Sequence, residues 1–299
     1  MYHIHYIIKK TQINNKSKID KGFFVVYNVS KGGNSMKCIE LYNELKSMAA
    51  LPVNEDKTCD TFKSGNPEAE ITKVATTMFA TPDVIREAAE WGANLLIVHE
   101  PTYYNHMDNE VDYPIAKEKQ KLIEEKGLTI FRFHDYAHSF EPDIICEGQL
   151  TVLDLPGQFK KGKYFATNSY ILDDEITAVE LAKIIEKNIG LKHVRIAGNP
   201  NAVGRKISCS FGTPGHLEEG LAENDFVLTG EICEWGLGEM ARDYAQLGYN
   251  KAIIVMGHIG SERCGMQILA ERIKELHPEL EAKYIECGEV YSYTDEVLL

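Results

Sequence analysis

Short apolar runs alternate with helix-like segments along most of the chain, and this alternation restricts its fold more than any other feature. The run "LLIV" at 95–98 is typical of a buried strand. Segment 81–92 predicts a helix with marked ends, because Thr81 can cap it, Pro82 suits its first turn and Gly92 suits its end. The pattern predicts an α/β fold with mostly parallel strands covered on both faces.

The expected elements fill the chain from residue 37 onward. We expect helices over 37–50, 81–92, 113–127, 176–190, 237–248 and 261–276. We expect strands over 71–80, 94–100, 128–135, 169–175, 193–199, 206–212, 225–231, 251–258 and 282–288.

Two parts of the chain resemble each other and favour a duplicated architecture. In each, a helix is followed by a similar tripeptide, "GAN" at 92–94 and "GYN" at 248–250, and then by an apolar strand that ends in histidine. We therefore expect two similar lobes, over about 36–150 and 151–299, with a metal cleft between them. Chance similarity is the alternative, because loops between helices and strands favour glycine.

Residues 1–35 differ from the rest of the chain. They hold six lysines and one aspartate and show no clear helical or strand periodicity. The tripeptide "KGG" at 31–33 can be encoded by AAA-GGA-GGN, which looks like a ribosome-binding site just before the codon of Met36. The hypothesis is that the native protein begins at Met36; an ordinary flexible extension is the alternative. The intact mass of the native protein distinguishes them.

Composition and charge argue against several classes of protein. The net charge of −13 argues against a general nucleic-acid binder, which usually has a basic face. No apolar run approaches the roughly 18 residues that a membrane span needs. The seven cysteines occur singly, which is typical of reduced thiols and not of a disulfide framework. We therefore expect a cytoplasmic protein whose partners are neither membranes nor nucleic acids.

Four expected strands end in histidine or carboxylate side chains. These chain positions are His99-Glu100, His134-Asp135 with His138, Thr229-Gly230-Glu231, and Gly257-His258 with Glu262. In open α/β sheets, ligands bind at the carboxyl ends of the strands. Each group alone has a structural explanation, such as a hydrogen-bonded interior histidine or a carboxylate at the start of a helix. Their recurrence at four strand ends favours one shared site.

A set of histidines and carboxylates without cysteine suits Zn, Mn, Fe, Co or Ni. The candidates exceed the needs of one ion, so we expect two divalent ions bridged by a carboxylate, either Glu262 or Glu100. Other catalytic templates are absent from the sequence: it has no G-x-G-x-x-G after a strand, no Walker A motif, no G-x-S-x-G and no H-E-x-x-H.

Four segments, taken in order, resemble the Nif-three-like family of dinuclear-metal-centre proteins, whose members are often labelled GTP cyclohydrolase I type 2 homologues. The segments are "GANLLIVHEPTYY", "FRFHDYAH", "DFVLTGEICEWGLGEMA" and "KAIIVMGHIGSE". The similarity runs from about Gly65 to Val290. It implies two related α/β lobes with a cleft between them, and a homo-oligomer, typically a ring-shaped hexamer with the metal sites facing its interior.

The resemblance also implies a ligand set, with two departures from the family motifs. The second histidine of the family's His-His-Pro is Glu100 here, and the aspartate of its His-x-x-x-Asp is His138. The resemblance and the strand ends together predict a variant two-metal site whose bridging carboxylate has moved to Glu100 or Asp135. The expected ligands are His99, Glu100, Asp135, His138, His258 and Glu262.

The sequence therefore predicts a metal-dependent hydrolase-like enzyme acting on a small molecule through a metal-activated water. His134 or Glu231 is expected to shuttle protons. The family label implies opening of the GTP ring, although the sequence shows no purine-recognition motif. The alternatives are a non-catalytic protein that binds or delivers metal, a regulatory scaffold, and a structural protein without metal.

Overall fold

Two β-sheets and the helices around them form the molecule. The computed structural model describes residues 35–108, 112–162, 166–213 and 215–294. The first sheet has the strand order β1-β4-β3-β2-β11, in which β11, β2, β3 and β4 run parallel and β1 is an antiparallel edge. Its strands are β1 (Phe62–Ser64), β2 (Lys73–Thr77), β3 (Leu95–Val98), β4 (Thr129–Arg132) and β11 (Glu281–Tyr284).

The second sheet has the order β5-β6-β8-β9-β10-β7. Strands β8, β9 and β10 are parallel, whereas β5, β6 and β7 pair antiparallel with their neighbours. The strands are β5 (Gly157–Lys161), β6 (Asn168–Thr177), β7 (Arg195–Gly198), β8 (Val203–Ser210), β9 (Phe226–Thr229) and β10 (Ala252–Val255). Among the described strands, five neighbouring pairs are parallel and four antiparallel, which confirms the α/β class with mostly parallel strands.

The helices follow the predicted pattern, with additions. Helix α2 begins and ends as expected: the Thr81 side chain accepts a hydrogen bond from the Val84 N–H, and Gly92 ends it at φ 89°. The helices are α1 (Cys38–Ser47), α2 (Pro82–Trp91), α3 (Pro114–Lys126), α4 (Asp135–His138), α5 (Ile144–Leu153), α6 (Ala178–Ile185), α7 (Leu217–Glu223), α8 (Glu239–Gln246) and α9 (His258–Leu276), with π-helical turns η1 (Glu186–Gly190) and η2 (Glu234–Gly238). The sequence did not predict β1, β5, α4, α5 or α7.

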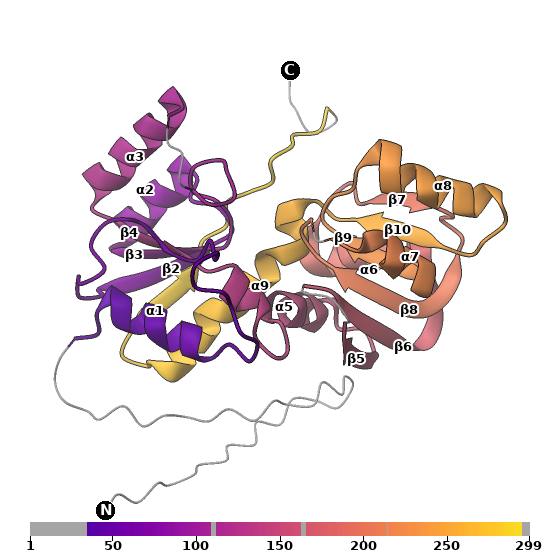
Figure 1. Cartoon of the computed structure of the whole chain (residues 1–299), viewed down its shortest axis with the longest axis horizontal. Coiled ribbons are helices and arrows are strands. Elements are labelled where there is room, and N and C mark those ends of the chain that lie inside the picture. Colours follow the sequence, from indigo (N-terminus) through magenta and orange to yellow (C-terminus); the bar gives the residue numbers. More distant parts are fainter. Residues whose placement is uncertain (1–34, 109–111, 163–165, 214, 295–299) are drawn as a thin grey trace, which may run out of the picture.

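Helices α5 and α9 lie between the two sheets, as Figure 1 shows. Their backbones touch because both carry glycine at the crossing: a Cβ on Gly148 would lie 2.5 Å from the Cys264 backbone, and one on Gly265 would lie 2.6 Å from Ile145 Cα. One apolar core runs through this region and includes Ile97 of β3 as well as residues of β9. The packing fixes α9 against the first sheet, where it contacts β2 and β11.

The chain returns to the first sheet at its end, since β11 pairs in parallel with β2. The division into two lobes near residue 150 remains a proposal. Because β11 pairs with β2, residues 281–284 would belong to the first lobe in such a division. Apart from Ser35, the segment 1–35 and the hypothesis of a start at Met36 lie outside the described residues. Over the part of the chain that the structure describes, no helix combines the length and apolar character that crossing a membrane requires.

Candidate metal centre

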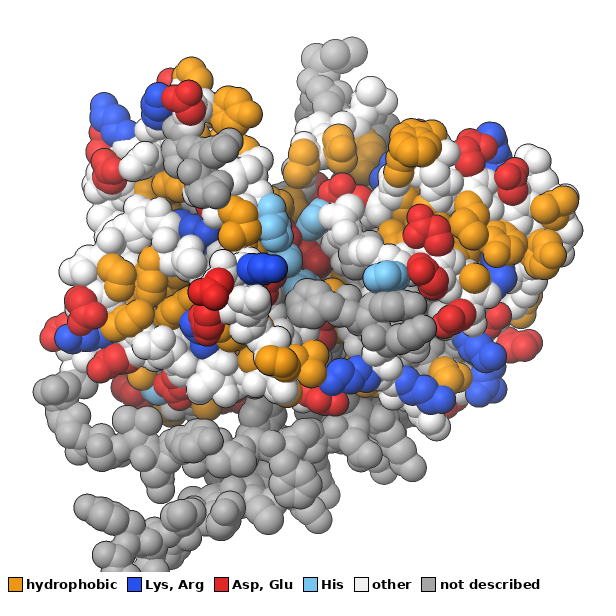
Figure 2. Space-filling model, in the orientation of Figure 1, with side chains coloured by type: hydrophobic (Ala, Val, Ile, Leu, Met, Phe, Trp, Pro, Cys, Tyr) orange, Lys and Arg blue, Asp and Glu red, His pale blue; other side chains and the backbone are white. Residues whose placement is uncertain are grey.

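Side chains from two strand ends and two helices converge at one place. His99 and Glu100 follow β3, His134 follows β4, His138 ends α4, and α9 carries His258 and Glu262 one turn apart. Helix α9 starts at His258, directly after Gly257, so the two ligand candidates share a face of the helix. Figure 2 shows histidine side chains gathered around a hollow in the middle of the visible face.

His99 and Glu262 form the most buried part of the site. The Nδ1–H of His99 donates to the Phe133 carbonyl at 3.1 Å, which leaves a lone pair on Nε2. That Nε2 lies 3.7 Å from Oε2 of Glu262. Both atoms are buried. Among the described residues, Nε2 of His99 has no hydrogen-bond partner, whereas Oε2 of Glu262 lies 3.2 Å from Nε2 of His258. Burial, then the nearby His134, lowers the pKa of His99, so its imidazole is neutral and available to a cation.

His138 approaches the other oxygen of the same carboxylate. Its Nδ1–H donates to Oδ2 of Asp143 at 2.9 Å, and its Nε2 lies 3.9 Å from Oε1 of Glu262. Burial acts to lower the pKa of His138, but the attraction of Asp143 and a hydrogen bond to it outweigh burial and raise the pKa to about 9. A carboxylate that holds Nδ1 and leaves Nε2 facing inward is typical of metal-binding histidines.

His258 joins Glu262 to Glu100. Its Nε2 lies 3.0 Å from Oε1 of Glu100 and 3.2 Å from Oε2 of Glu262, and its Nδ1 lies 2.9 Å from Oε1 of Glu231. Burial acts to lower the pKa of His258, but the hydrogen bonds to Glu100 and Glu262 raise it to about 11. Without metal, His258 is therefore an imidazolium between carboxylates, at a position where a cation can replace the proton.

Glu100 is held on two sides. Its Oε2 accepts a hydrogen bond from the Arg132 guanidinium at 3.2 Å, and its Oε1 faces His258 and also lies 3.8 Å from Nε2 of His134. Burial raises the pKa of Glu100, but the hydrogen bond from His258 and the charges of nearby histidines lower it overall. Glu100 is therefore ionised, as a metal ligand must be.

Asp135 lies beside this set, and its oxygens are already engaged. Oδ1 accepts from the Nδ1–H of His134 at 2.9 Å, and Oδ2 accepts from the Thr58 hydroxyl and the Cys59 N–H. Burial raises the pKa of Asp135, but these hydrogen bonds, led by that from His134, lower it overall. Ligand atoms of Cys59, His134 and Asp135 do lie within 4.8 Å of one another, so a metal-binding role for Asp135 stays a proposal.

All four histidines share one orientation. In each, Nδ1 is held by a protein acceptor, which is Phe133 O for His99, Asp135 for His134, Asp143 for His138 and Glu231 for His258. The opposite nitrogen, Nε2, lies within 4 Å of an oxygen of Glu262 or Glu100 in every case. Ligand atoms of His99, His134 and His138 form one compact group within 4.8 Å, and those of His99, Glu100 and Glu262 form another. This donor set fits Zn, Mn, Fe, Co or Ni.

Three residues that sequence reasoning missed shape the site. Asp143 holds His138, Arg132 holds Glu100, and Gly212 lies against Glu262, where a Cβ would come within 2.4 Å of Oε1. Gly212 also has φ +66°, which favours glycine. One signal was available for Arg132, since it is a charged residue inside the apolar run "LTIFRF".

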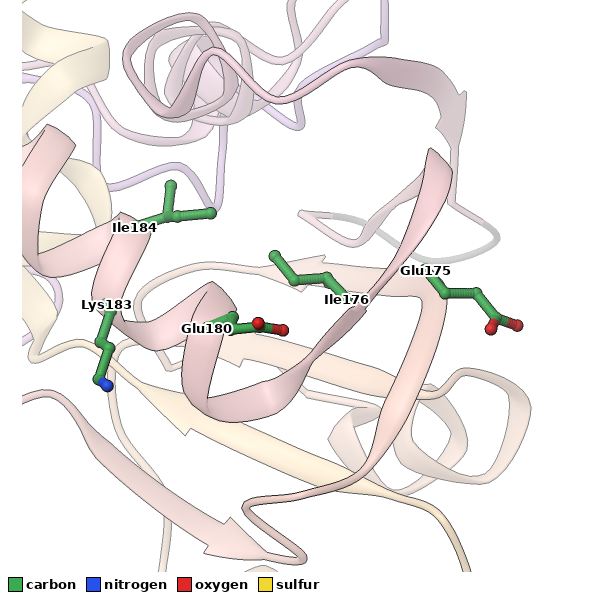
Figure 3. Close-up of a pocket in the computed structure, with 5 residues that line it drawn as sticks. All are labelled: Glu175, Ile176, Glu180, Lys183 and Ile184. Carbon is green, nitrogen blue, oxygen red and sulfur yellow. The ribbon is translucent and has the colours of Figure 1, made fainter.

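A second concave area is formed by residues of β6 and α6, and its described lining residues include no histidine. It is lined by Glu175, Ile176, Glu180, Lys183 and Ile184, as Figure 3 shows. Glu180 is already engaged there, because it caps α6 through Thr177. None of the candidate metal ligands lines this area, so the metal centre remains the candidate functional site.

Comparisons with known proteins show what this chain is similar to. A protein named GTP cyclohydrolase 1 type 2 homolog, from Clostridium perfringens, is 24% identical over 253 residues, covering 80% of this chain and 92% of its own. A protein of the same name from Neisseria meningitidis serogroup B is 28% identical over 211 residues, covering 69% and 80%. The crystal structure of Staphylococcus aureus protein SA1388 has the same fold, with a TM-score of 0.71 at 15% identity over 86% of this chain and 99% of that one.

The family comparison covers the whole site. The model of the family described as Duf34/NIF3 (NGG1p interacting factor 3) matches residues 36–289, which include all the candidate ligands. Because that match spans most of the sequence, the chain belongs to the Duf34/NIF3 family.

Proposed function

We propose that the chain binds two divalent metal ions and acts as a metal-dependent hydrolase on a small molecule. The observation that carries the proposal is the common orientation of the four histidines, whose Nε2 atoms face two buried carboxylates. In this proposal Glu262 is the shared carboxylate, in preference to Glu100 or Asp135. Its Oε1 lies near His138 and its Oε2 near His99 and His258.

The proposed ligands fall into two sets around Glu262. His99 and His138 would hold one ion, with His134 beside them, and His258 and Glu100 would hold the other. Divalent ions in such a centre supply Lewis acidity and lower the pKa of a bound water. The protein's part is to hold each imidazole by its Nδ1 and to keep the deepest ligands, His99 and Glu262, buried from solvent.

Proton transfer would fall to residues at the edge of the site. The side chain of Glu231 is 53% exposed and contacts Nδ1 of His258, so it can exchange a proton with solvent. His134 lies at the end of β4 and is paired with Asp135 through Nδ1, which leaves Nε2 to face Glu100. Both remain the proposed proton shuttles of a hydrolytic reaction.

The relatives' names make GTP the first substrate to test, under the proposal that this chain shares the reaction those names denote. We also propose that the protein works as a homo-oligomer, with a hexameric ring as the form implied by its resemblance to the family. The cytoplasm is the proposed location, supported by cysteines that are all free thiols within the described structure. Native mass spectrometry tests the oligomer.

The test of function combines metal content with a substrate panel. Purified protein is analysed for metal per chain and assayed with GTP, other nucleotides, phosphoesters and cyclic amides. The proposal expects turnover that chelation removes and that His258→Ala loses together with most of the metal. The matched control is His277→Gln, because His277 pairs with Glu44 and Glu279 outside the site. Stoichiometric metal with no turnover on any substrate would favour a metal-delivery or scaffold protein.

A further inference from the structure

Arg132 is a fully buried arginine at the end of β4. Its guanidinium donates three hydrogen bonds to the segment that follows β3. Nε donates to the His99 carbonyl at 2.9 Å, Nη2 donates to Oε2 of Glu100 at 3.2 Å, and Nη1 donates to the His106 carbonyl. A single planar group thus ties the two ligand candidates His99 and Glu100 to the loop beyond them.

The contact with Glu100 decides which oxygen of that carboxylate is free. Oε2 lies against Arg132, while Oε1 points to Nε2 of His258 at 3.0 Å. A carboxylate can bind a cation through one oxygen or through both. With Oε2 on the guanidinium, the oxygen turned toward the other ligand candidates is Oε1.

The same contact explains how a carboxylate is tolerated at this depth. The side chain of Glu100 is 8% exposed and that of Arg132 is 0% exposed. Burying either charge alone would be strongly unfavourable, whereas a hydrogen-bonded pair satisfies both. A lysine at 132 would keep the positive charge, but one ammonium group cannot reproduce the planar arrangement of three donors.

We infer that Arg132 is a positioning residue of the metal centre, which holds Oε2 of Glu100 so that Glu100 presents Oε1 alone to a divalent cation. The inference rests on the proposed two-metal function and adds to it a residue that binds no metal itself. Arg132 acts through Glu100, so its effect on metal binding requires that carboxylate.

A double-mutant cycle tests this dependence. Metal-free wild type, Arg132→Lys, Glu100→Gln and the double variant are titrated with Co²⁺ and Zn²⁺ against a competing chelator. We expect Arg132→Lys to weaken one of the two metal equivalents by about 10–100-fold, as loss of an orienting partner usually does, and to alter the Co²⁺ absorption spectrum. The double variant should bind as Glu100→Gln alone does. Arg272→Lys is the matched control, because Arg272 pairs with Glu147 outside the site.

The outcomes separate this inference from the proposed function. Wild-type protein that binds no metal would refute the proposed function before any variant is compared. Wild-type protein that binds two ions, with Arg132→Lys unchanged in affinity and spectrum, would overturn the inference alone. Losses in the double variant equal to the product of the two single losses would also overturn it, because Arg132 would then act without Glu100.

A structure of the metal-loaded wild type provides a second test that needs no variant. This test stands even if Arg132→Lys fails to fold, which the melting of the metal-free protein would reveal. The inference expects Glu100 to contact the metal through Oε1, with Oε2 still hydrogen bonded to Arg132. Chelation of one ion by both oxygens, or release of Oε2 from Arg132, would contradict it.

Discussion

Nε2 of His99 and Oε2 of Glu262 face each other at 3.7 Å in the interior, and Nε2 of His99 has no hydrogen-bond partner among the described residues. Buried polar atoms without partners are uncommon because each costs free energy. A cation between them would satisfy both lone pairs at once. This relationship joins the end of β3 to helix α9 and lies at the centre of the proposed function.

Replacing Glu262 by glutamine tests the shared carboxylate. The variant keeps the size of the side chain but removes its charge, and its amide group cannot act as an anionic ligand for two ions. We expect metal affinity to fall by at least about a hundredfold. Loss of a residue that only orients a metal ligand usually costs about 10–100-fold, and loss of a ligand itself should cost at least as much. Chelator competition measures the loss. Glu271→Gln on the same helix is the control, since Glu271 is exposed and pairs with Lys274.

Asp143→Asn tests how His138 is oriented. Asparagine can still cap α5, where Asp143 now accepts from the N–H groups of Ile145 and Cys146. It can also donate to Nδ1 of His138, which would place the imidazole proton on Nε2 and block that atom as a ligand. We expect about 10–100-fold weaker metal binding with little change in the melting temperature of the metal-free protein. Unchanged affinity would contradict an orienting role of the Asp143 carboxylate for His138.

Glu231→Gln tests whether the Glu231 carboxylate, which contacts Nδ1 of His258, strengthens metal binding by that histidine. The side chain is about half exposed, so the fold should be unaffected. Loss of the carboxylate at Nδ1 makes the imidazole a weaker ligand, and we expect metal affinity to fall by about 10–100-fold. Metal titration of the variant measures this effect. An exposed carboxylate on the neighbouring turn, Glu234, gives the control variant Glu234→Gln, which should bind as the wild type does.

Metal binding should release protons and tighten as the pH rises. In the metal-free protein the pKa of His138 is about 9 and that of His258 about 11, so both imidazoles are protonated at pH 7. Metal displaces those protons, so the free form binds more protons than the loaded form. Affinity therefore increases steeply with pH up to about 9, where His138 loses its proton, and less steeply up to about 11, where His258 does. Calorimetry in buffers of different ionisation enthalpy should show about two protons released per chain at pH 7. No proton release would contradict the roles of both histidines.

Much of the site could be predicted because parallel strands bring their carboxyl ends to one edge of a sheet. That rule selected His99, His258 and their neighbours from position alone. It did not reveal Asp143, which reaches His138 from the start of α5. Helix α5 was missed because it is buried almost all round, so "IICEGQLTVL" shows little helical periodicity.

Other features depend on contacts between distant parts of the chain. Strand β1 has only three residues and forms through pairing with β4. So short a segment shows no periodicity from which a strand could be predicted. The contacts of Asp135 could not be predicted, because its carboxylate accepts hydrogen bonds from Thr58 and Cys59, which lie in the distant segment before β1. The expected last strand, 282–288, is shorter in the structure, because only Glu281–Tyr284 pair with β2.

Titration of the metal-free wild-type protein with Co²⁺, followed by its absorption and by metal analysis of the dialysed complex, tests the central claim most directly. The proposed centre predicts saturation at two equivalents per chain, with both lost or greatly weakened in Glu262→Gln. Saturation after one equivalent would contradict the two-ion centre, and an absence of stoichiometric binding would contradict the metal centre itself.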